Sequence, residues 1–178
     1  LPDPSGALVF YSAIKRNQVK EICSSHYQFI NDELGSLFLS MSQDGDGRAP
    51  KGEMTLIASL FTETKEWFDL SKEMYSIKKN FYLDKISLAI EDKFKISSNQ
   101  WLHRELATPL GFQKWTNRPR GMVGGLGQNI NTFGLFGISS RTPLQGLWLC
   151  GDSIYPGEGT AGVSQSALMV SKQILASR

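Results

Sequence analysis

The sequence predicts an α+β fold, in which a mixed or mostly antiparallel sheet between Ala7 and Ala107 carries one long helix on a face. Short apolar segments rich in β-prone residues recur along this part of the chain, as in the strands of such a sheet. One longer segment after Ser71 has the 3.6-residue periodicity of a helix instead. The third observation is a short apolar run near the C-terminus, followed by a glycine-rich loop and a second helical pattern.

The segments with the composition of strands are Ala7–Ile14, Tyr27–Ile30, Leu34–Ser42, Glu53–Thr62 and Trp101–Ala107. The polar residues 43–52 between the third and fourth segments predict an antiparallel hairpin with a long loop. Asp44 and Asp46 give this loop a superficial likeness to a calcium site. It lacks the later ligands and the terminal glutamate of such a site, so we interpret it as a turn.

The long helix should begin after Ser71, which is a good N-cap residue, and continue to Lys95. Charged side chains fill much of its surface, which predicts a helix that packs on the sheet and faces solvent on its other side. We interpret its apolar stripe as core rather than as a ligand site. The stripe consists of Met74, Ile77, Phe81, Ile86, Ile90 and Phe94. A short helix or turn should begin at Thr108–Pro109 and continue towards Trp115.

The C-terminal pattern is the one with chemical content. Leu147–Cys150 predicts a short buried strand that ends at Gly151 and contains Cys150 as a buried thiol. A helix follows, with Val163, Ala167, Val170 and Ile174 on one face. Glycines let the backbone approach a ligand closely, and a helix N-terminus favours negative charge. Asp152, placed at the strand end, is a good acceptor for sugar-like hydroxyl groups.

Composition excludes several classes of protein. The chain has 178 residues, 40% hydrophobic, with a net charge of +2 and scattered basic residues, which is no nucleic-acid signature. No run approaches the length of a membrane span. Cys23 and Cys150 form no disulfide framework, and His26 and His103 have no metal-ligand spacing. No catalytic acid, base or nucleophile stands out, so the catalytic residues stay unknown.

Three stretches carry a resemblance to a family. The segment LWLCGDSIYPGEG, residues 147–159, resembles the C-terminal FAD-binding signature of the carotenoid desaturases and isomerases, within the amine-oxidase-like flavoproteins. Ala107–Pro109, with Phe112 and residues 118–121, resembles the segment before that family's final loop. Leu37–Met41, with residues 49–52 and 61–63, resembles the isomerase-like branch and its close desaturase relatives.

The resemblance implies a role for each residue of the signature. Asp152 would bond the ribityl chain of FAD, and the residues that shape the loop would be Gly151, Pro156, Gly157 and Gly159. The helix N-terminus at the pyrimidine edge of the flavin would be formed by Thr160, Ala161, Gly162 and Val163. Trp115, Phe133 and Phe136 would line a substrate tunnel or belong to the core. Glu158, where the family often has Gln, and Ala167 after Ser166, where it has Gly, depart from the pattern.

The resemblance also implies a domain organisation. Residues 1–143 would be a substrate-domain-like region, and residues 144–178 the C-terminal strand, loop and helix of an FAD-binding domain. The family's ADP-binding βαβ unit with its Gly-x-Gly-x-x-Gly motif is not found, and the chain begins without Met. We therefore expect the C-terminal portion of a longer protein, which alone would bind FAD weakly or not at all.

The function first implied is that of an FAD-dependent carotenoid desaturase, which abstracts a hydride from an allylic C–H bond of an apolar polyene. One alternative is a redox-neutral cis–trans isomerase that uses reduced FAD. Others are a non-catalytic fragment that binds a lipid or protein, and a general amine oxidase. Because carotenoids reside in membranes, the parent protein would be cytoplasmic or peripheral to a membrane.

Overall fold

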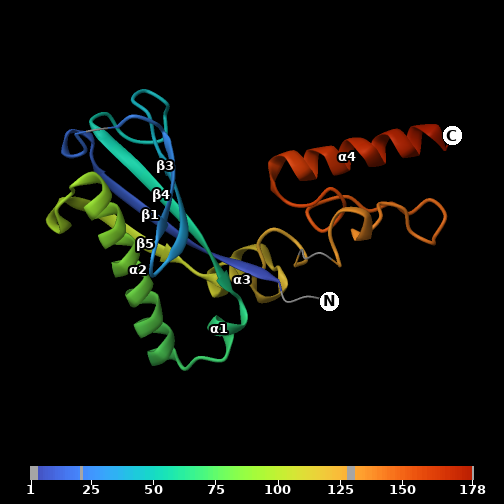
Figure 1. Ribbon diagram of the computed structural model, residues 1–178, viewed down its shortest axis with the longest axis horizontal. Helices are drawn as coiled ribbons and strands as arrows, with labels where there is room; N and C mark the ends of the chain where they lie inside the picture. The colour runs from blue at the N-terminus through green and yellow to red at the C-terminus, as the bar shows by residue number, and fades with distance from the viewer. Residues whose placement is uncertain (1–3, 21, 128–130, 178) are drawn as a thin grey trace. The chain divides into compact units, whose positions relative to one another are not determined.

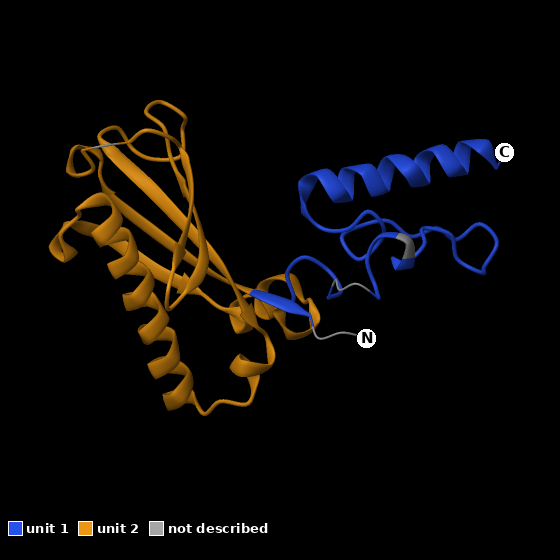
Figure 2. Ribbon diagram, in the orientation of Figure 1, with its two compact units in different colours: residues 1–6, 122–178 blue, residues 7–121 orange. Residues whose placement is uncertain are grey.

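The computed structural model describes residues 4–20, 22–127 and 131–177. The chain folds into two compact units, one of residues 7–121 and one of residues 1–6 with 122–178 (Figure 2). Below, they are the sheet unit and the loop-helix unit. The sheet unit contains most of β1 (Ser5–Lys15), and η1 (Arg16–Gln18), β2 (His26–Asn31), β3 (Gly35–Met41), β4 (Glu53–Glu63), α1 (Lys65–Phe68), α2 (Lys72–Phe94), η2 (Ser98–Gln100), β5 (Trp101–Ala107), α3 (Pro109–Thr116) and η3 (Pro119–Gly121). The loop-helix unit contains η4 (Gly134–Phe136) and α4 (Gly159–Ala176).

The strands form one sheet in the order β2-β3-β4-β1-β5 (Figure 1). The β1–β5, β2–β3 and β3–β4 pairs are antiparallel, with Phe10 opposite Leu106 and Leu39 opposite Ala58. The predicted α+β class, the mostly antiparallel sheet and the hairpin with a long loop are therefore confirmed. The boundary between the units, at residues 121 and 122, differs from the predicted functional boundary at residues 143 and 144, which stays a prediction.

The core lies between one face of the sheet and α2. Successive strand side chains point to opposite faces, so every second residue of β1, β3 and β4 is buried. The buried set on these strands is Leu8, Phe10, Ile14, Leu37, Leu39, Met41, Met54, Leu56, Ala58 and Leu60. Ser12 interrupts the row, and its hydroxyl donates to the Leu56 carbonyl at 2.9 Å. From α2, Ile86 and Ile90 complete this core.

The predicted N-terminus of α2 is confirmed, but its predicted core stripe is half wrong. The Ser71 hydroxyl accepts a hydrogen bond from the Met74 N–H at 3.2 Å. Ile86 and Ile90 are fully buried, whereas Ile77 is 56% exposed. The reason is helical phase: Ile77 and Ile86 are nine residues, or two and a half turns, apart and lie on opposite faces. Near the start of α2, the side chains that pack on the core are instead Tyr75, Tyr82 and Leu83.

The other face of the sheet carries no helix of its own unit (Figure 1). Its apolar side chains are exposed: Tyr11 on β1, Ile30 on β2, Phe38 on β3, and Ile57 and Phe61 on β4. Small polar residues lie between them, such as Ser59 opposite Phe38. We call this surface the open sheet face.

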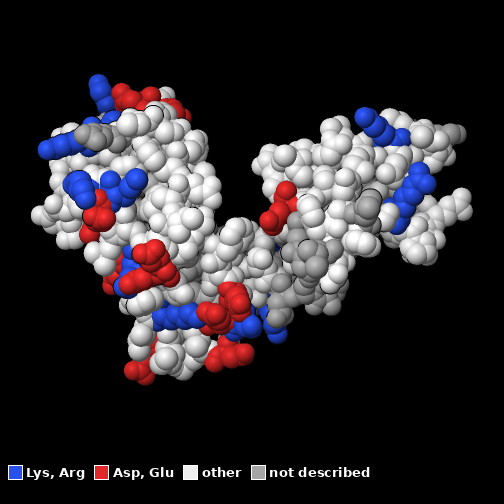
Figure 3. Space-filling model, in the orientation of Figure 1, with Lys and Arg blue, Asp and Glu red and all other residues white. Residues whose placement is uncertain are grey.

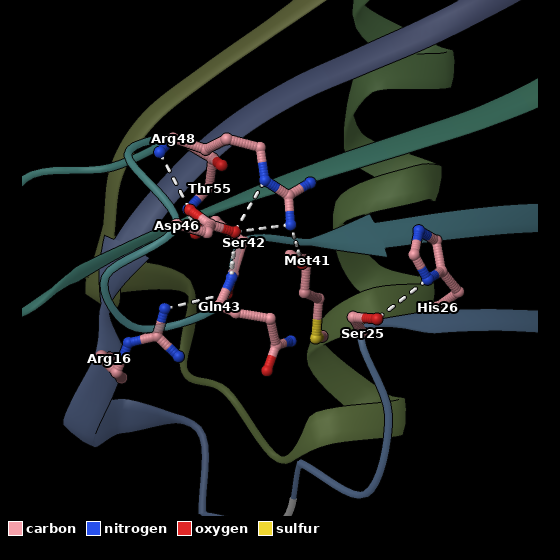
Figure 4. A network of polar contacts seen from close by, with 9 residues as sticks. All are labelled: Arg16, Ser25, His26, Met41, Ser42, Gln43, Asp46, Arg48 and Thr55. Carbon is pink, nitrogen blue, oxygen red and sulfur yellow. Dashed lines mark hydrogen bonds and ion pairs between the residues drawn. The ribbon is translucent and has the colours of Figure 1, made fainter.

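A polar network orders the loop between β3 and β4 (Figure 4). The Asp46 carboxylate accepts hydrogen bonds from the backbone N–H groups of Gln43 and Arg48. The Arg48 guanidinium bonds Asp46 at 2.7 Å and the Met41 carbonyl at 3.0 Å, and Arg16 bonds the Ser42 carbonyl at 2.8 Å. Because of these bonds, the pKa of Asp46 is lowered to about 2, with the Arg48 N–H as the largest cause.

In the loop-helix unit, the predicted strand Leu147–Cys150 is wrong. Only an isolated bridge between Arg141 and Trp148 is present, Leu149 is 40% exposed, and Cys150 is exposed rather than buried. A strand needs neighbours for its backbone groups, and the described part of this unit offers no further strand. The helix after the glycine loop is confirmed as α4. No described helix is long and apolar enough to cross a membrane.

Candidate functional site

The glycine loop before α4 adopts a backbone that other residues disfavour. Gly151, Gly157 and Gly159 have φ angles of +127°, +124° and +79°. At such positive φ angles an L residue is strained by its own adjacent peptide groups, which is why glycine is favoured at these positions. The three predicted loop glycines therefore allow the backbone conformation that connects Cys150 to α4.

The loop folds closely against the first turn of α4. A Cβ atom on Gly162 would lie 2.4 Å from the Gly157 carbonyl oxygen, well inside van der Waals contact. Thr160 and Ala161 are exposed in the same turn, and Val163 is half-buried. The residues predicted to form the helix N-terminus beside a cofactor do form that terminus.

The electrostatics of this terminus suit an anionic or electron-rich group. Glu158 is the N-cap residue of α4, yet it makes no side-chain capping hydrogen bond. The first turn itself contains no acidic residue, and the exposed Glu158 at the N-cap position is an acidic residue at the positive end of the helix dipole. Peptide N–H groups at the start of an 18-residue helix are therefore available to an acceptor from outside the helix.

The Asp152 segment is fixed from two sides. On one side the Gly151 N–H donates to the hydroxyl of Ser166, a fully buried residue of α4, at 3.1 Å. On the other side the Ser153 hydroxyl accepts from the Leu126 N–H at 3.2 Å and lies 3.4 Å from Asp152 Oδ1. The half-buried carboxylate of Asp152 is thus presented from a fixed backbone.

A glycine pair missed by the sequence reasoning completes this support. Gly124 and Gly125 have φ angles of +83° and +80°. A Cβ on Gly125 would lie 2.7 Å from the Asp152 carbonyl carbon, and one on Gly124 would overlap the Glu158 carboxylate. The only signal in the sequence was the density of glycines in this long loop, which could not tell which of them contact the signature.

A small cavity of about 60 Å³ adjoins the signature. Pro156 and Gly157 line it together with Phe133 and Phe136, which are 52% and 71% exposed and so are no part of a core. The structure therefore brings two of the three predicted substrate residues to the loop. Trp115 lies on α3 in the sheet unit and is 81% exposed, with the Lys114 ammonium 5.2 Å from its ring centre.

Side chains with acid, base or metal chemistry do not converge here. Within the described ranges, no three His, Cys, Asp or Glu residues are placed as a metal site would require. His103 lies on β5, where its Nε2 is 3.6 Å from the Glu105 carboxylate and both side chains are exposed. The arrangement around Asp152 is suited to holding a ligand rather than to proton transfer by a dyad.

Comparison with known proteins relates the chain to the carotenoid isomerase and desaturase type of family. No family model matches it. It is 30% identical to the chloroplastic prolycopene isomerase of Daucus carota over 145 residues, 80% of this chain and 23% of the relative. It is 29% identical to chloroplastic prolycopene isomerase 2 of an Oncidium hybrid cultivar, over 80% of this chain and 24% of that protein. It is 27% identical to the chloroplastic prolycopene isomerase of Arabidopsis thaliana, over 87% of this chain and 26% of that one. The chain spans about a quarter of the length of these relatives.

Proposed function

We propose that this chain is part of a carotenoid cis–trans isomerase that works with reduced FAD. The relatives carry the name of an isomerase, so they favour this alternative over the desaturase that the sequence first implied. The observation that carries the proposal is the juxtaposition of Asp152 with the uncapped N-terminus of α4 in a chain so related. Because the chain covers a quarter of those proteins, the activity is proposed for the protein of which it would form part.

The residues present fit the polar edge of a flavin. Asp152 would accept hydrogen bonds from ribityl hydroxyl groups, and the loop glycines Gly151, Gly157 and Gly159, with Pro156, would let the backbone approach the cofactor. Thr160, Ala161, Gly162 and Val163 would place α4's N–H groups at the pyrimidine edge. A Cβ at Gly162 would fill the space in which the loop packs on α4, so this cradle depends on glycine.

The substrate side is apolar, as a polyene requires. Phe133 and Phe136 line the cavity beside the signature, which is too small to hold a whole carotenoid and would take one part of it or the flavin edge. Burial of such a chain against aromatic and aliphatic side chains is driven by the hydrophobic effect.

The chemistry divides between cofactor and protein. Reduced FAD, when bound, supplies electron density that assists rotation about a conjugated double bond. The protein's residues would orient the ring and stabilise negative charge. The helix dipole of α4 would act at the pyrimidine edge, and Asp152 would hold the ribityl chain. Phe133 and Phe136 would give a bound polyene apolar contact at the cavity.

A flavin titration tests the cofactor site. The chain, alone and joined to the remaining part of one of the relatives, is titrated with FAD while flavin fluorescence is followed. We expect weak or no binding by the chain alone and binding by the joined protein. Asp152→Asn should weaken that binding by about tenfold to a hundredfold, since a charged hydrogen-bond partner is worth about 1.5–3 kcal/mol. Glu158→Gln, the matched exchange, should leave it within about threefold. Equal losses in both variants would contradict the role of Asp152.

A product assay separates the isomerase from the desaturase. The joined protein, with reduced FAD under anaerobic conditions, is given a poly-cis polyene and a more saturated one. We expect a change of double-bond geometry in the first and no new double bond in the second. Formation of additional double bonds in the second substrate would show that the desaturase interpretation is the right one.

A further inference from the structure

Arg141 holds its guanidinium beside the indole ring of Trp148 in the loop-helix unit. The two residues form an isolated backbone bridge, and the guanidinium carbon lies 5.4 Å from the Trp148 ring centre. The Arg141 Nε–H donates to Gln173 Oε1 on α4 at 3.2 Å, and the Gln173 amide donates to the hydroxyl of the buried Ser140 at 3.2 Å. The ring contact and the bond to Gln173 together fix the orientation of the guanidinium.

A closed loop forms one wall beside this guanidinium. The Thr142 hydroxyl accepts from the Leu144 N–H at 3.1 Å and donates to the Leu147 carbonyl at 2.9 Å, and the Leu147 N–H donates to the Leu144 carbonyl at 3.2 Å. A hollow of about 320 Å³ is lined by this loop, Arg141 and Trp148, which we call the Arg141 hollow. Its volume is at the lower end of the range of small-molecule sites.

Among the described residues, no acidic side chain balances the charge of Arg141. The lining of the Arg141 hollow contains no Asp or Glu, and the ion pairs of the described residues do not include Arg141. Asp152 and Glu158 precede α4, whereas Gln173 lies in the last turn of that helix. Figure 3 shows the Lys and Arg side chains of the loop-helix unit apart from its Asp and Glu side chains. Since Gln173 uses the Nε–H, the two terminal Nη groups remain for an acceptor from outside.

We propose that the Arg141 hollow binds a small carboxylate that is carried on an apolar body, such as an alicyclic or aromatic carboxylic acid. The two Nη groups of a guanidinium form a planar fork that matches the two oxygens of a carboxylate. Trp148 supplies an aromatic surface beside this fork, and Leu144 and Leu147 are 65% and 48% exposed. One hollow thus offers adjacent surfaces for the charge and for the apolar body.

A phosphate group fits the Arg141 hollow less well than a carboxylate does. A phosphate ester carries close to two negative charges at neutral pH and is commonly held by several backbone N–H groups. Here the N–H groups of Leu144 and Leu147 are used within the loop, and that of Leu149 donates to the Ser140 carbonyl at 2.8 Å. One guanidinium without such donors is matched by one negative charge.

Titration of the purified chain with cyclohexanecarboxylate, without FAD or polyene, tests the site. The indole N–H signals in a ¹H–¹⁵N NMR spectrum report on the place of binding, because Trp148 lies in the hollow and the other three tryptophans lie in the sheet unit. We expect the Trp148 signal alone to shift, with a Kd on the order of 1 mM for a ligand of this size. Trp148→Phe assigns the signal.

Two exchanges of the same kind separate the fork from general charge. Arg141→Gln should weaken binding by about tenfold or more, as expected for loss of hydrogen bonds to a charged group. Arg120→Gln changes an exposed arginine of the sheet unit and should bind like the wild type.

A ligand series on the wild type needs no variant that might fail to fold. Acetate, which lacks the apolar body, should bind about threefold to tenfold more weakly than cyclohexanecarboxylate. The uncharged cyclohexanecarboxamide should shift the Trp148 signal by far less at the same concentration.

The outcomes separate this proposal from its rivals. A selective shift of the Trp148 signal that Arg141→Gln weakens and Arg120→Gln does not supports the carboxylate site. No such shift, equal shifts of all four indole signals, equal binding by Arg141→Gln, or equal binding of the amide overturns it. Tighter binding of inorganic phosphate, or of a tetraglutamate peptide, would assign the hollow to a phosphate ligand or to an acidic protein partner instead. If Arg141→Gln lowers the stability of α4 and leaves the titration unchanged, Arg141 serves only the negative end of that helix. The titration contains no FAD, so its result is independent of the proposed function.

Discussion

Replacing Gly162 by alanine tests whether the close packing of loop and helix matters. A methyl group there would lie 2.4 Å from the Gly157 carbonyl oxygen, so the loop must retreat by about 1 Å to reach the 3.4 Å of an ordinary contact. In an open helical position the same change would stabilise α4 by up to about 1 kcal/mol. Overpacking against backbone costs about 1–3 kcal/mol. We therefore expect a net loss of about 1 kcal/mol, or a fall in Tm of roughly 2–4 °C.

Gly111→Ala is the matched control. Gly111 lies in the first turn of α3, and a Cβ atom there would meet nothing within 4 Å. This variant should be as stable as the wild type or more stable by about 0.5 kcal/mol. Both variants are measured by urea denaturation, with hydrogen exchange of residues 157–166 reporting on α4 itself. If Gly162→Ala gains stability as Gly111→Ala does, the loop is not packed on the helix as described and the cradle does not exist.

Three further predictions concern named hydrogen bonds. Ser71→Ala removes the cap of α2 and should cost about 1 kcal/mol in urea denaturation, whereas Ser76→Ala, in the exposed part of the same helix, should cost less than 0.5 kcal/mol. Ser166→Ala leaves the Gly151 N–H without its acceptor and should destabilise α4 by about 1–3 kcal/mol, while Ser171→Ala on its exposed side should not. Asp46 has a folded pKa of about 2 against an ordinary 3.8, so its contribution to stability is present above pH 3.8 and is lost as the pH falls towards 2. Denaturation between pH 2 and 5 should show this slope in the wild type and a smaller one in Asp46→Asn; equal slopes would contradict it.

Strand identity could be predicted from the sequence because it follows from local pattern. The apolar alternation of residues such as Leu37, Leu39 and Met41 defines a half-buried strand before any partner is known. The order β2-β3-β4-β1-β5 could not be derived in the same way. This order places β1 between β4 and β5, both of which are far from β1 in the sequence. Pairings of this kind depend on packing across the whole sheet rather than on either strand alone.

The phase of α2 shows how a correct element can be assigned a wrong core. Met74, Ile77 and Phe81 have one helical phase, and Ile86 and Ile90 have the opposite one. Treating them as one stripe ignored the five-residue step from Phe81 to Ile86. The predicted stripe does not contain Tyr75 and Tyr82, which do pack on the core: the Tyr75 hydroxyl is satisfied by Thr108 at 2.9 Å and its ring packs on Trp67.

At the candidate site, the sequence indicated which residues are suited to binding a ligand, but not which contacts hold those residues in place. Gly157 and Gly159 could be predicted as backbone positions open to a ligand because glycine alone tolerates such φ angles. Gly125 and Asp152, which lie close together, are 27 residues apart in the chain. Their contact depends on how residues 122–127 fold back against the Asp152 loop. The predicted strand at Leu147–Cys150 is wrong because apolar composition alone does not produce burial, and a strand is stable only beside a partner.

The two units differ in what stabilises them, and this bears on the cofactor. The sheet unit has a continuous core from β1, β3, β4 and α2. Among the described residues of the loop-helix unit, the buried hydrophobic side chains are Ile154 and Val170, while Leu144, Leu168 and Leu175 are more than half exposed. Glycine contacts and hydrogen bonds such as Gly151 to Ser166 therefore hold the Asp152 loop, with little hydrophobic support. A ligand that bound only the ordered loop at a hundred times its Kd would add about 2.7 kcal/mol to the stability of this unit, which is large beside so small a core. Cofactor binding and the order of this unit should thus be strongly coupled, and this coupling gives a physical reason for the weak FAD binding expected of the chain alone.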